Sequence, residues 1–378
     1  MRGTDRSLTD RSAARGYHGR TTMHARWHLS VAMAVIALTI ACASVGPKTI
    51  PHDNFNYTEA IRDSWKEQML LNLVGLRYAE APLFLRVTSV INQYSFDGRI
   101  SAATKPYEGA GPSAPPFGVS GGYSDRPTIT YTPMTGADFT RSVMTPIPPA
   151  RIMEMIQAGW RADLLMRLAV RSVNGIGATS ALGQSTDPTS FYEVVLLMEK
   201  LQNSTGLSFR VEPRGSGDAA IVMIPSSSTQ QAQLWRARLG ELLRLDPDRA
   251  EYRLVFGHQA ADGSEIAMLT RSILEMLAEL AMWVDVPPEH VASGRTRPSA
   301  DPESMQELGF EPMIRVRSSQ DRPDDAFAVV RYQGRWFWVD HDDFASKRTL
   351  GLMQLMFSLA ESGRVQEAPV ITVGAGGG

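Results

Sequence analysis

The pattern of apolar and polar residues predicts a series of amphipathic helices. In the first of them, apolar residues recur every three or four positions and therefore share one helical face: Ile61, Trp65, Met69, Leu73 and Leu76. Asn56 and Glu59 have the spacing of a capping box, so we expect this helix to begin at Asn56. The same period predicts further helices over residues 139–144, 150–158, 187–201, 229–245, 272–283 and 343–361.

Short segments rich in β-branched and aromatic residues lie between these helices and predict strands. Turns are expected at Gly215–Asp218, Asp262-Gly263 and Gln333-Gly334, each joining two strands into a hairpin. The apolar segment 164–173 fits either a strand or a helix. The predicted strands are residues 83–96, 128–131, 207–211, 219–224, 252–256, 265–269, 314–317, 327–332 and 336–339.

A hairpin followed by a helix recurs three times after residue 205. This recurrence predicts antiparallel sheet with packing helices, which is an α+β fold. We expect two α+β regions, residues 56–175 and 185–363, divided at the loop-like stretch between them. Residues 106–122 hold nine prolines and glycines in seventeen positions, which predicts a long exposed loop or a disordered insertion. The tail, residues 364–378, is expected to be flexible.

An uncharged, largely apolar stretch near the amino terminus, residues 29–41, indicates export. Its thirteen residues are too few to span a bilayer, which takes roughly 20, but they match the apolar core of a signal peptide. A basic stretch, residues 24–28, precedes it. We therefore expect translation to begin at Met23, so that residues 1–22 are a mis-assigned extension and residues 23–41 a cleaved signal peptide.

Cys42 is the chain's only cysteine, which excludes an internal disulfide and a cysteine-based zinc cluster. The stretch Leu38-Thr39-Ile40-Ala41-Cys42 resembles the lipobox of bacterial lipoproteins, except that Thr39 stands where leucine is usual. The resemblance implies cleavage between Ala41 and Cys42, followed by acylation of Cys42. Several acyl chains, at about 0.8 kcal/mol per buried methylene, would hold the protein on a membrane essentially permanently. A cleaved signal with a chance cysteine and an uncleaved anchor are the alternatives.

The same resemblance carries an expectation about location. Residues 42–55 would form a lipidated tether, and Ala43 stands where an aspartate would retain a Gram-negative lipoprotein in the inner membrane. By that analogy we expect an outer-membrane protein that faces the periplasm, with the inner membrane as the alternative. The body is similar to uncharacterised Gram-negative envelope lipoproteins in segments such as Thr145–Pro149, and this similarity implies no activity.

The net charge of the chain bears on which class of partner it could bind. Lysine and arginine number 38 against 40 acidic residues. Residues 1–41 hold six arginines and two aspartates, so the remainder has 32 basic and 38 acidic residues, a net charge of −6. A mildly acidic body gives no electrostatic reason to expect nucleic acid. The expected partners are a membrane, through Cys42, and a periplasmic protein.

Three short motifs could carry chemistry. Gly118–Gly122 matches the G-x-S-x-G of serine hydrolases, but no helix follows, so we interpret it as a chance match. Gly175–Ser180 begins like a dinucleotide fingerprint without its third glycine, and we interpret it as a loop. The run Asp340–Asp343 lies between a strand and a helix, where helix capping by Asp342 or Asp343 is favoured over metal binding. We therefore expect neither a metal nor a cofactor.

Histidines are the remaining catalytic candidates. His258, His290 and His341 could each act as a general base, since histidine titrates near neutral pH. A rival hypothesis is thus an anchored hydrolase, which requires one of them to lie beside a serine or carboxylate. A third hypothesis is a small apolar ligand held between the methionine-rich helices 272–283 and 349–361, although core packing is the simpler role of those methionines.

An aromatic cluster on one predicted strand provides the candidate interaction patch. Side chains alternate along a strand, so Trp336 and Trp338 share one face and Phe337 lies on the other. If the second face is exposed, it would be a surface for a protein partner. The leading hypothesis is therefore an anchored, non-catalytic envelope protein that works through contacts with another protein.

Overall fold

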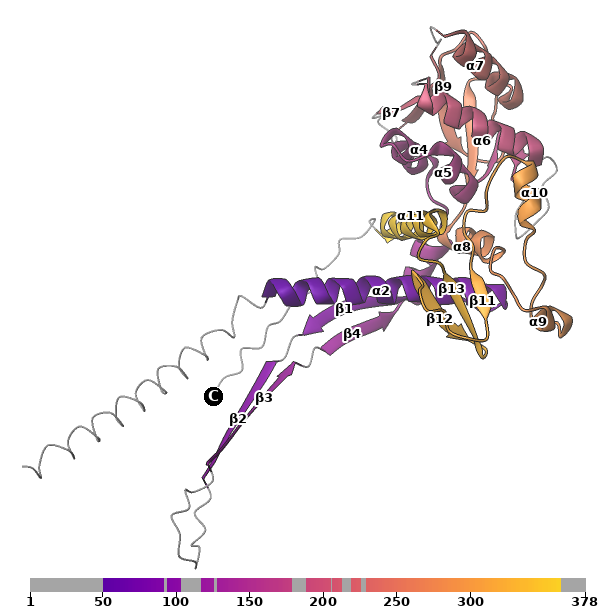
Figure 1. Ribbon diagram of the computed structural model, residues 1–378. Coiled ribbons are helices and arrows are strands. Elements are labelled where there is room, and N and C mark those ends of the chain that lie inside the picture. The colour runs from indigo at the N-terminus through magenta and orange to yellow at the C-terminus, as the bar shows by residue number, and fades with distance from the viewer. Residues whose placement is uncertain are drawn as a thin grey trace, which may run out of the picture. The chain divides into compact units, whose positions relative to one another are not determined.

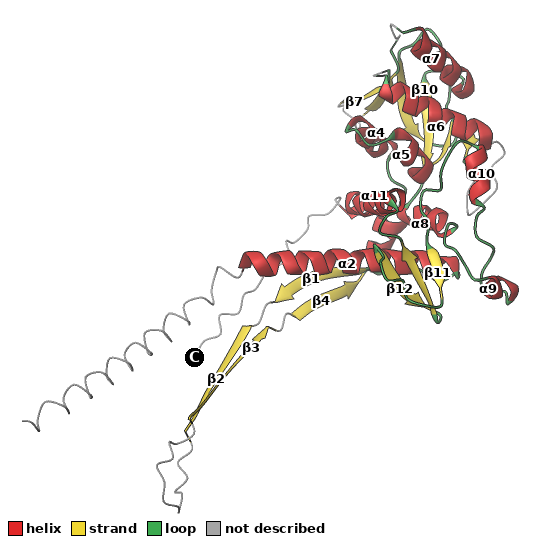
Figure 2. Cartoon of the chain, in the orientation of Figure 1, coloured by secondary structure: helices red, strands yellow, loops and turns green. Residues whose placement is uncertain are grey.

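The computed structural model describes residues 50–91, 94–102, 117–125, 128–178, 188–204, 206–212, 219–225 and 229–361. The chain divides into two compact units, Met1–Trp65 and Lys66–Gly378, and helix α2 (Ile50–Arg77) crosses this division. Figures 1 and 2 show the helical elements: α2 (Ile50–Arg77), α3 (Gly136–Phe139), the π-helical turn η1 (Thr140–Met144), α4 (Pro149–Gln157), α5 (Ala162–Ala169), α6 (Pro188–Asn203), α7 (Gln230–Leu243), α8 (Ile273–Ala281), α9 (Pro288–Ala292), α10 (Pro302–Glu307) and α11 (Phe344–Glu361).

Within the described residues the strands form a six-stranded sheet, a three-stranded sheet and two two-stranded ribbons, so the chain has the α+β fold that its sequence predicts. The orders are β6-β5-β10-β9-β8-β7, β11-β13-β12, β1-β4 and β2-β3. The strands are β1 (Leu85–Ile91), β2 (Tyr94–Ala102), β3 (Phe117–Asp125), β4 (Thr128–Pro133), β5 (Val170–Val173), β6 (Ile176–Gly177), β7 (Ser208–Glu212), β8 (Ala219–Met223), β9 (Glu251–Phe256), β10 (Glu265–Thr270), β11 (Arg317–Ser319), β12 (Ala328–Tyr332) and β13 (Arg335–Val339).

The six-stranded sheet joins both of the regions expected from the sequence. Strand β5 precedes the expected division at residues 175–184 and β6 lies within it, yet both strands belong to one sheet with β7 to β10. Helix α4 contacts β7, β9 and β10, while α5 leads directly into β5. The ambiguous segment 164–173 thus contains both structures, because the chain leaves α5 at Ala169 and enters β5 at Val170.

Local signals placed several elements correctly. The sequence predicted α4, α6, α7, α8 and α11, and the antiparallel pairs β7–β8 and β12–β13 are the expected hairpins. Helix α8 begins at a capping box: the Ser272 hydroxyl accepts the Glu275 amide, and the Glu275 carboxylate accepts the Ser272 amide. These two reciprocal bonds satisfy amides that the first helical turn leaves free.

The pairing of β9 with β10 corrects a prediction. The sequence indicated a hairpin turned at Asp262-Gly263, but β9 and β10 run parallel, with Glu265 opposite Arg253. The connection after Phe256 therefore returns along the sheet before β10 begins, and β10 pairs antiparallel with β5 on its other side. A turn signal marks where the chain bends, whereas the partner of a strand depends on residues far away in sequence.

The amino-terminal part of the described chain differs from the prediction in two places. Helix α2 begins at Ile50, so residues 50–55 are helical rather than tether, and Asn56 is not its cap. Pro51 is compatible with this start, because the first helical turn needs no amide donor. Residues 117–122, expected in a loop, lie in β3, where pairing with β2 outweighs the low strand propensity of glycine. Residues 103–116 of that expected loop lie outside the described residues.

Two further differences from the prediction lie in the carboxyl-terminal part of the described chain. The strand expected at residues 314–317 starts only at Arg317, and Val316 makes a single bridge to Val284. The proline-rich stretch 287–312, expected to be mainly loop, contains α9 and α10. Each of these short helices has a proline in its first turn, where proline favours a helix start rather than a loop.

Candidate functional site

The three-stranded sheet has one buried face and one partly exposed face. On the buried face Phe337 is 0% exposed and is flanked by Val330. On the other face Trp336 and Trp338 are partly exposed. This is the alternation expected from the sequence. The partly exposed set, called the tryptophan face below, consists of Trp336, Trp338, Arg317, Ser319, Val329 and Arg331.

The hairpin turn fixes which residues meet on this face. Gln333 and Gly334 have φ angles of 46° and 83°, the left-handed pair of a two-residue turn that matches the twist of the strands. The resulting register places Arg331 opposite Trp336. Strand β11 pairs on the other side of β13 and brings Arg317 opposite Trp338.

Arginine side chains surround the two indoles. The guanidinium of Arg322 lies 5.4 Å from the ring centroid of Trp336, and that of Arg331 lies 5.9 Å from it. The indole N–H of Trp338 donates to Asp340 Oδ1 at 2.8 Å, and Arg317 pairs with the second oxygen of Asp340 at 2.7 Å. Each of the two cation–π contacts on Trp336 contributes about 0.5–1 kcal/mol at an exposed site. These contacts hold the ring of Trp336, and the hydrogen bond to Asp340 holds the ring of Trp338, in a defined orientation.

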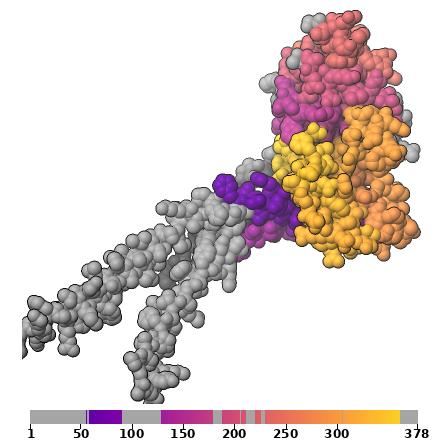
Figure 3. All heavy atoms as spheres, viewed as in Figure 1, coloured from indigo at the N-terminus to yellow at the C-terminus, as the bar shows by residue number. Residues whose placement is uncertain are grey.

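Two shallow hollows border the tryptophan face and meet at Asp325. One, of about 590 Å³, is lined by Arg317, Asp340 and the residues that follow Asp340. The other, of about 510 Å³, is lined by Arg322, Asp325 and Val329. These residues lie in the carboxyl-terminal segment, coloured orange to yellow, which forms a continuous part of the surface seen in Figure 3. The site combines apolar rings with charges of both signs.

The sequence identified the two tryptophans but not the arginines around them. Arg331 could have been found, because a two-residue turn at Gln333-Gly334 dictates its position opposite Trp336. Arg317 and Arg322 come from outside the hairpin, and no sequence signal places them there.

The acidic run after β13 performs structural tasks. The Asp343 carboxylate accepts the Ser346 amide at 3.0 Å and the Ser346 hydroxyl at 2.7 Å, which caps α11 as predicted. Asp340 is engaged by Arg317 and Trp338. His341 is 59% exposed, with its Nδ1 atom 3.9 Å from Asp325. In the described part of the chain, no group of three or more histidine, cysteine, aspartate or glutamate side chains could hold a metal ion.

His258 lies beside a serine, as the hydrolase hypothesis requires, but that serine is buried. Its Nδ1 atom lies 3.1 Å from the hydroxyl of Ser172 on β5, a distance suited to a nucleophile and its base. Ser172 is only 2% exposed and lies between β6 and β10 in the sheet. A substrate carbonyl has no access to a hydroxyl buried in this way. We interpret the contact as a structural hydrogen bond that satisfies a buried serine.

His290 belongs to the core rather than to a cleft. It is 6% exposed, and its Nδ1 atom lies 2.7 Å from the hydroxyl of Tyr78 at the end of α2. The two rings meet edge to face, with centroids 5.7 Å apart. Burial raises the pKa of Tyr78, and nearby Arg335 acts in the opposite direction. The buried hydrogen bond between Tyr78 and His290 thus joins the end of α2 to α9.

The neighbouring Tyr332 gives a testable pH dependence. Burial, together with a 2.5 Å hydrogen bond to Glu80, raises its pKa to about 12 from the usual 10.0. The protonated hydroxyl of Tyr332 therefore contributes to folding stability. This contribution is fully present below pH 10 and is lost as the pH rises through about 12. In an ultraviolet absorbance titration, the tyrosine missing from Tyr332→Phe should titrate near 12. If the difference between the two titration curves had its midpoint near pH 10, the prediction would be wrong.

The two glycine motifs have structural roles within the described residues. Ser120 lies inside β3 and not at a turn from strand to helix, so the hydrolase motif has the wrong context. Asn174 and Gly175, with φ angles of 46° and 83°, form the tight turn between β5 and β6. Gly177 therefore belongs to a hairpin, and residues 179–187 lie outside the described residues.

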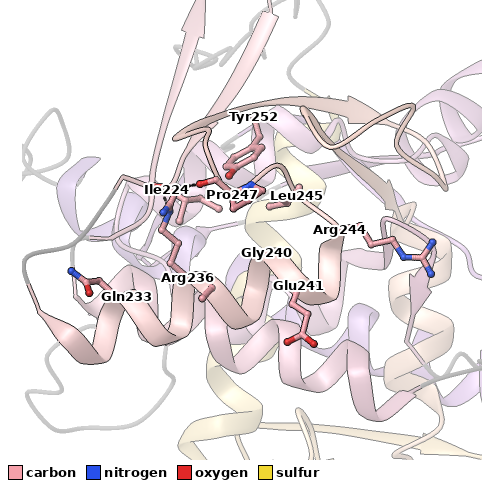
Figure 4. A pocket seen from close by; sticks show the side chains of 10 residues that line it. Ile224, Gln233, Arg236, Gly240, Glu241, Arg244, Leu245, Pro247 and Tyr252 are labelled. Atoms are coloured by element: carbon pink, nitrogen blue, oxygen red, sulfur yellow. Dashed lines mark hydrogen bonds between the residues drawn. The ribbon is translucent and has the colours of Figure 1, made fainter.

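The methionines of α8 and α11 pack in the core. Met276, Met353 and Met356 are each 0% exposed, and the two helices contact each other. A separate hollow of about 550 Å³ lies beside α7 (Figure 4). There Arg236 donates to the carbonyl oxygens of Ile224, Pro247 and Arg249, so its guanidinium fixes the chain around the hollow. Figure 4 shows Glu241 pointing away from Arg236 and Tyr252.

No protein-family model, no curated protein and no solved structure matches this chain. Among the residues that the structure describes, none of the helices has both the length and the apolar character needed to cross a membrane. The expected cleavage site at Ala41 and Cys42 lies outside the described residues, as do the rest of residues 1–49 and the tail from residue 362.

Proposed function

We propose that this protein is a lipid-anchored lipoprotein of the cell envelope whose α+β body binds a partner protein through the tryptophan face. The anchor rests on the sequence around Cys42. The contact surface rests on one observation: Trp336 and Trp338 are partly exposed on one face of a sheet whose opposite face is buried. Catalysis forms no part of the proposal, because Ser172 and His290 are buried in structural hydrogen bonds.

The composition of the face favours a protein as its partner. Tryptophan and arginine are enriched among the residues that dominate binding energy at protein interfaces. Arg322 and Arg331 stand over Trp336, so a partner would meet an apolar ring already fixed by two cations. The net charge of −6 after residue 41 gives no electrostatic reason to expect a nucleic acid as the partner.

The proposal is tested by photocrosslinking in a Gram-negative host that expresses the full chain. A photoreactive residue at Arg331 should give an adduct of defined mass with an envelope protein, because this position lies beside Trp336. The matched control carries the same residue at Arg151, which is 60% exposed on α4, and should give no such adduct. Adding Arg322→Glu should remove the adduct from position 331 by reversing a charge that faces the partner.

The same strain tests the anchor by intact mass and membrane fractionation. The wild-type chain should begin at Cys42, carry acyl mass and sediment with membranes, and Cys42→Ala should do none of these. Equal adducts from positions 331 and 151 would contradict the contact surface. A wild-type chain without acyl mass would contradict the anchor independently of that result.

A further inference from the structure

The hollow beside α7 has the size of a small-molecule site. Its volume is about 550 Å³, within the range of about 300–1,000 Å³ that ligand pockets span. One wall is a single stripe of α7, and the other is formed by apolar residues that follow β8 or lead into β9: Ile224, Leu245, Pro247 and Tyr252. Figure 4 shows Arg236 reaching from the helix toward this apolar wall. A ligand in the hollow would therefore lie between a charged helix face and apolar side chains.

The charges that line this hollow favour an anion. Three backbone carbonyl oxygens hold the Arg236 guanidinium, and they fix its position without neutralising its charge. Within the described residues, no carboxylate pairs with Arg236, and the Arg244 side chain forms neither a hydrogen bond nor an ion pair. Glu241 also lines the hollow, but Arg238 already pairs with it at 2.8 Å. The hollow thus has two cations that lack a carboxylate partner.

Gly240 lines the same hollow although the fold does not require a glycine there. It lies in the last turn of α7, and glycine is among the poorest helix formers. A Cβ atom at this position would meet no other atom within 4 Å, so packing gives no reason to exclude a side chain. A bound ligand gives such a reason, because an alanine methyl group would occupy part of the space above the helix.

Arg244 is a second position at which another residue would be more stable. It ends α7 with φ 54° and ψ 43°, a left-handed conformation in which helices usually have glycine. Ala79 ends α2 with the same geometry: the amide after each residue donates to a glycine carbonyl oxygen five positions back, at 2.8 Å for α7 and 2.9 Å for α2. No described contact of the Arg244 side chain offsets the backbone strain. Strain of this kind is often retained where the side chain has a function.

We propose that this hollow binds a small organic acid, with its carboxylate on Arg236 and its apolar body over Gly240. The described bonds of Arg236 involve Nε and Nη2, and the N–H groups of Nη1 can donate to a carboxylate. Ile224 and Pro247 contact the apolar body, and Arg244 attracts the anion from the carboxyl-terminal end of α7 (Figure 4). The inference is independent of the proposed function, since no residue of the tryptophan face lines this hollow.

The test is a fluorine NMR titration of the full chain, purified in detergent, with para-fluorobenzoate as the probe. Wild type should broaden the fluorine resonance of this acid and leave that of the uncharged para-fluorobenzamide sharp. Gly240→Ala should weaken binding of the acid about tenfold by filling the space of its apolar body. Arg244→Gly should weaken it about fivefold, because an exposed charge acts through solvent.

Each variant has a matched control elsewhere in the chain. Gly351→Ala fills open space on α11, and Ala79→Gly relieves the left-handed residue at the end of α2. All four substitutions should raise the urea midpoint, since each suits its backbone position better than the natural residue. Only Gly240→Ala and Arg244→Gly should also weaken binding, so that stability and binding change in opposite directions at the hollow alone.

Four results would overturn the inference. Wild type could fail to bind para-fluorobenzoate, or it could bind the uncharged amide equally well. Both Gly240→Ala and Arg244→Gly could bind the acid like wild type, which would place it elsewhere on the protein. A lower urea midpoint for Gly240→Ala would show that the fold itself needs this glycine.

Discussion

Replacing Arg271 by methionine should cost about 3–5 kcal/mol of folding stability, the loss expected when a buried charge is removed from its partners. Arg271 is 2% exposed, and its Nη1 atom donates to the carbonyl oxygens of Arg167, Leu168 and Val170 at 2.8, 3.2 and 2.9 Å. These carbonyls lie where α5 ends and β5 begins, and the last carbonyls of a helix have no partner within it. Urea unfolding measures the loss.

Two variants sharpen this experiment. Arg271→Lys keeps the charge, but an ammonium group cannot reproduce the planar fork that reaches several carbonyls, so it should recover only part of the loss. Arg238→Met removes an arginine from the surface of α7, where it pairs with Glu193 and Glu241, and should leave the urea midpoint unchanged. An unchanged midpoint for Arg271→Met would show that the α5–β5 junction does not depend on this side chain.

Replacing Phe337 by alanine should destabilise the protein by about 3–5 kcal/mol, because a closed cavity replaces a fully buried ring. Phe337 is 0% exposed, and its ring lies 6.4 Å from the rings of both Tyr78 and Tyr332. Truncation therefore removes aromatic contacts that join β13 to the end of α2. Urea unfolding of Phe337→Ala and wild type, followed by circular dichroism, measures the difference in free energy of unfolding.

The preceding residue along the same strand is the matched control. Trp336→Ala removes a larger side chain, yet it should cost less stability than Phe337→Ala, because a partly exposed site opens to solvent and leaves no closed cavity. Partner binding should show the opposite order: Trp336→Ala should weaken it more than Phe337→Ala does and should lose the crosslink from position 331. If Trp336→Ala proves the more destabilising of the two, the tryptophan face belongs to the core and is not a binding surface.

Parts of the candidate site followed from sequence because they depend on neighbours in the chain. The alternation over Trp336, Phe337 and Trp338 reflects the two-residue period of any strand. The turn at Gln333-Gly334 was also predicted, and it fixes the register that places Arg331 beside Trp336, although the sequence analysis did not name this arginine. The Ser172–His258 contact could not be predicted in this way, since it joins residues 86 positions apart on β5 and beyond β9.

The sequence by itself determined the local structure: the periods of α4, α6, α7, α8 and α11, a cap at Asp342 or Asp343, and the hairpin β12–β13. Only the tertiary structure decided which strands pair and which charges are buried. The parallel pairing of β9 with β10 is one such result, and Arg271, 104 residues beyond the Arg167 carbonyl that it binds, is another. Helical and strand periods arise from sterics between near neighbours, whereas pairing and burial depend on contacts between distant segments.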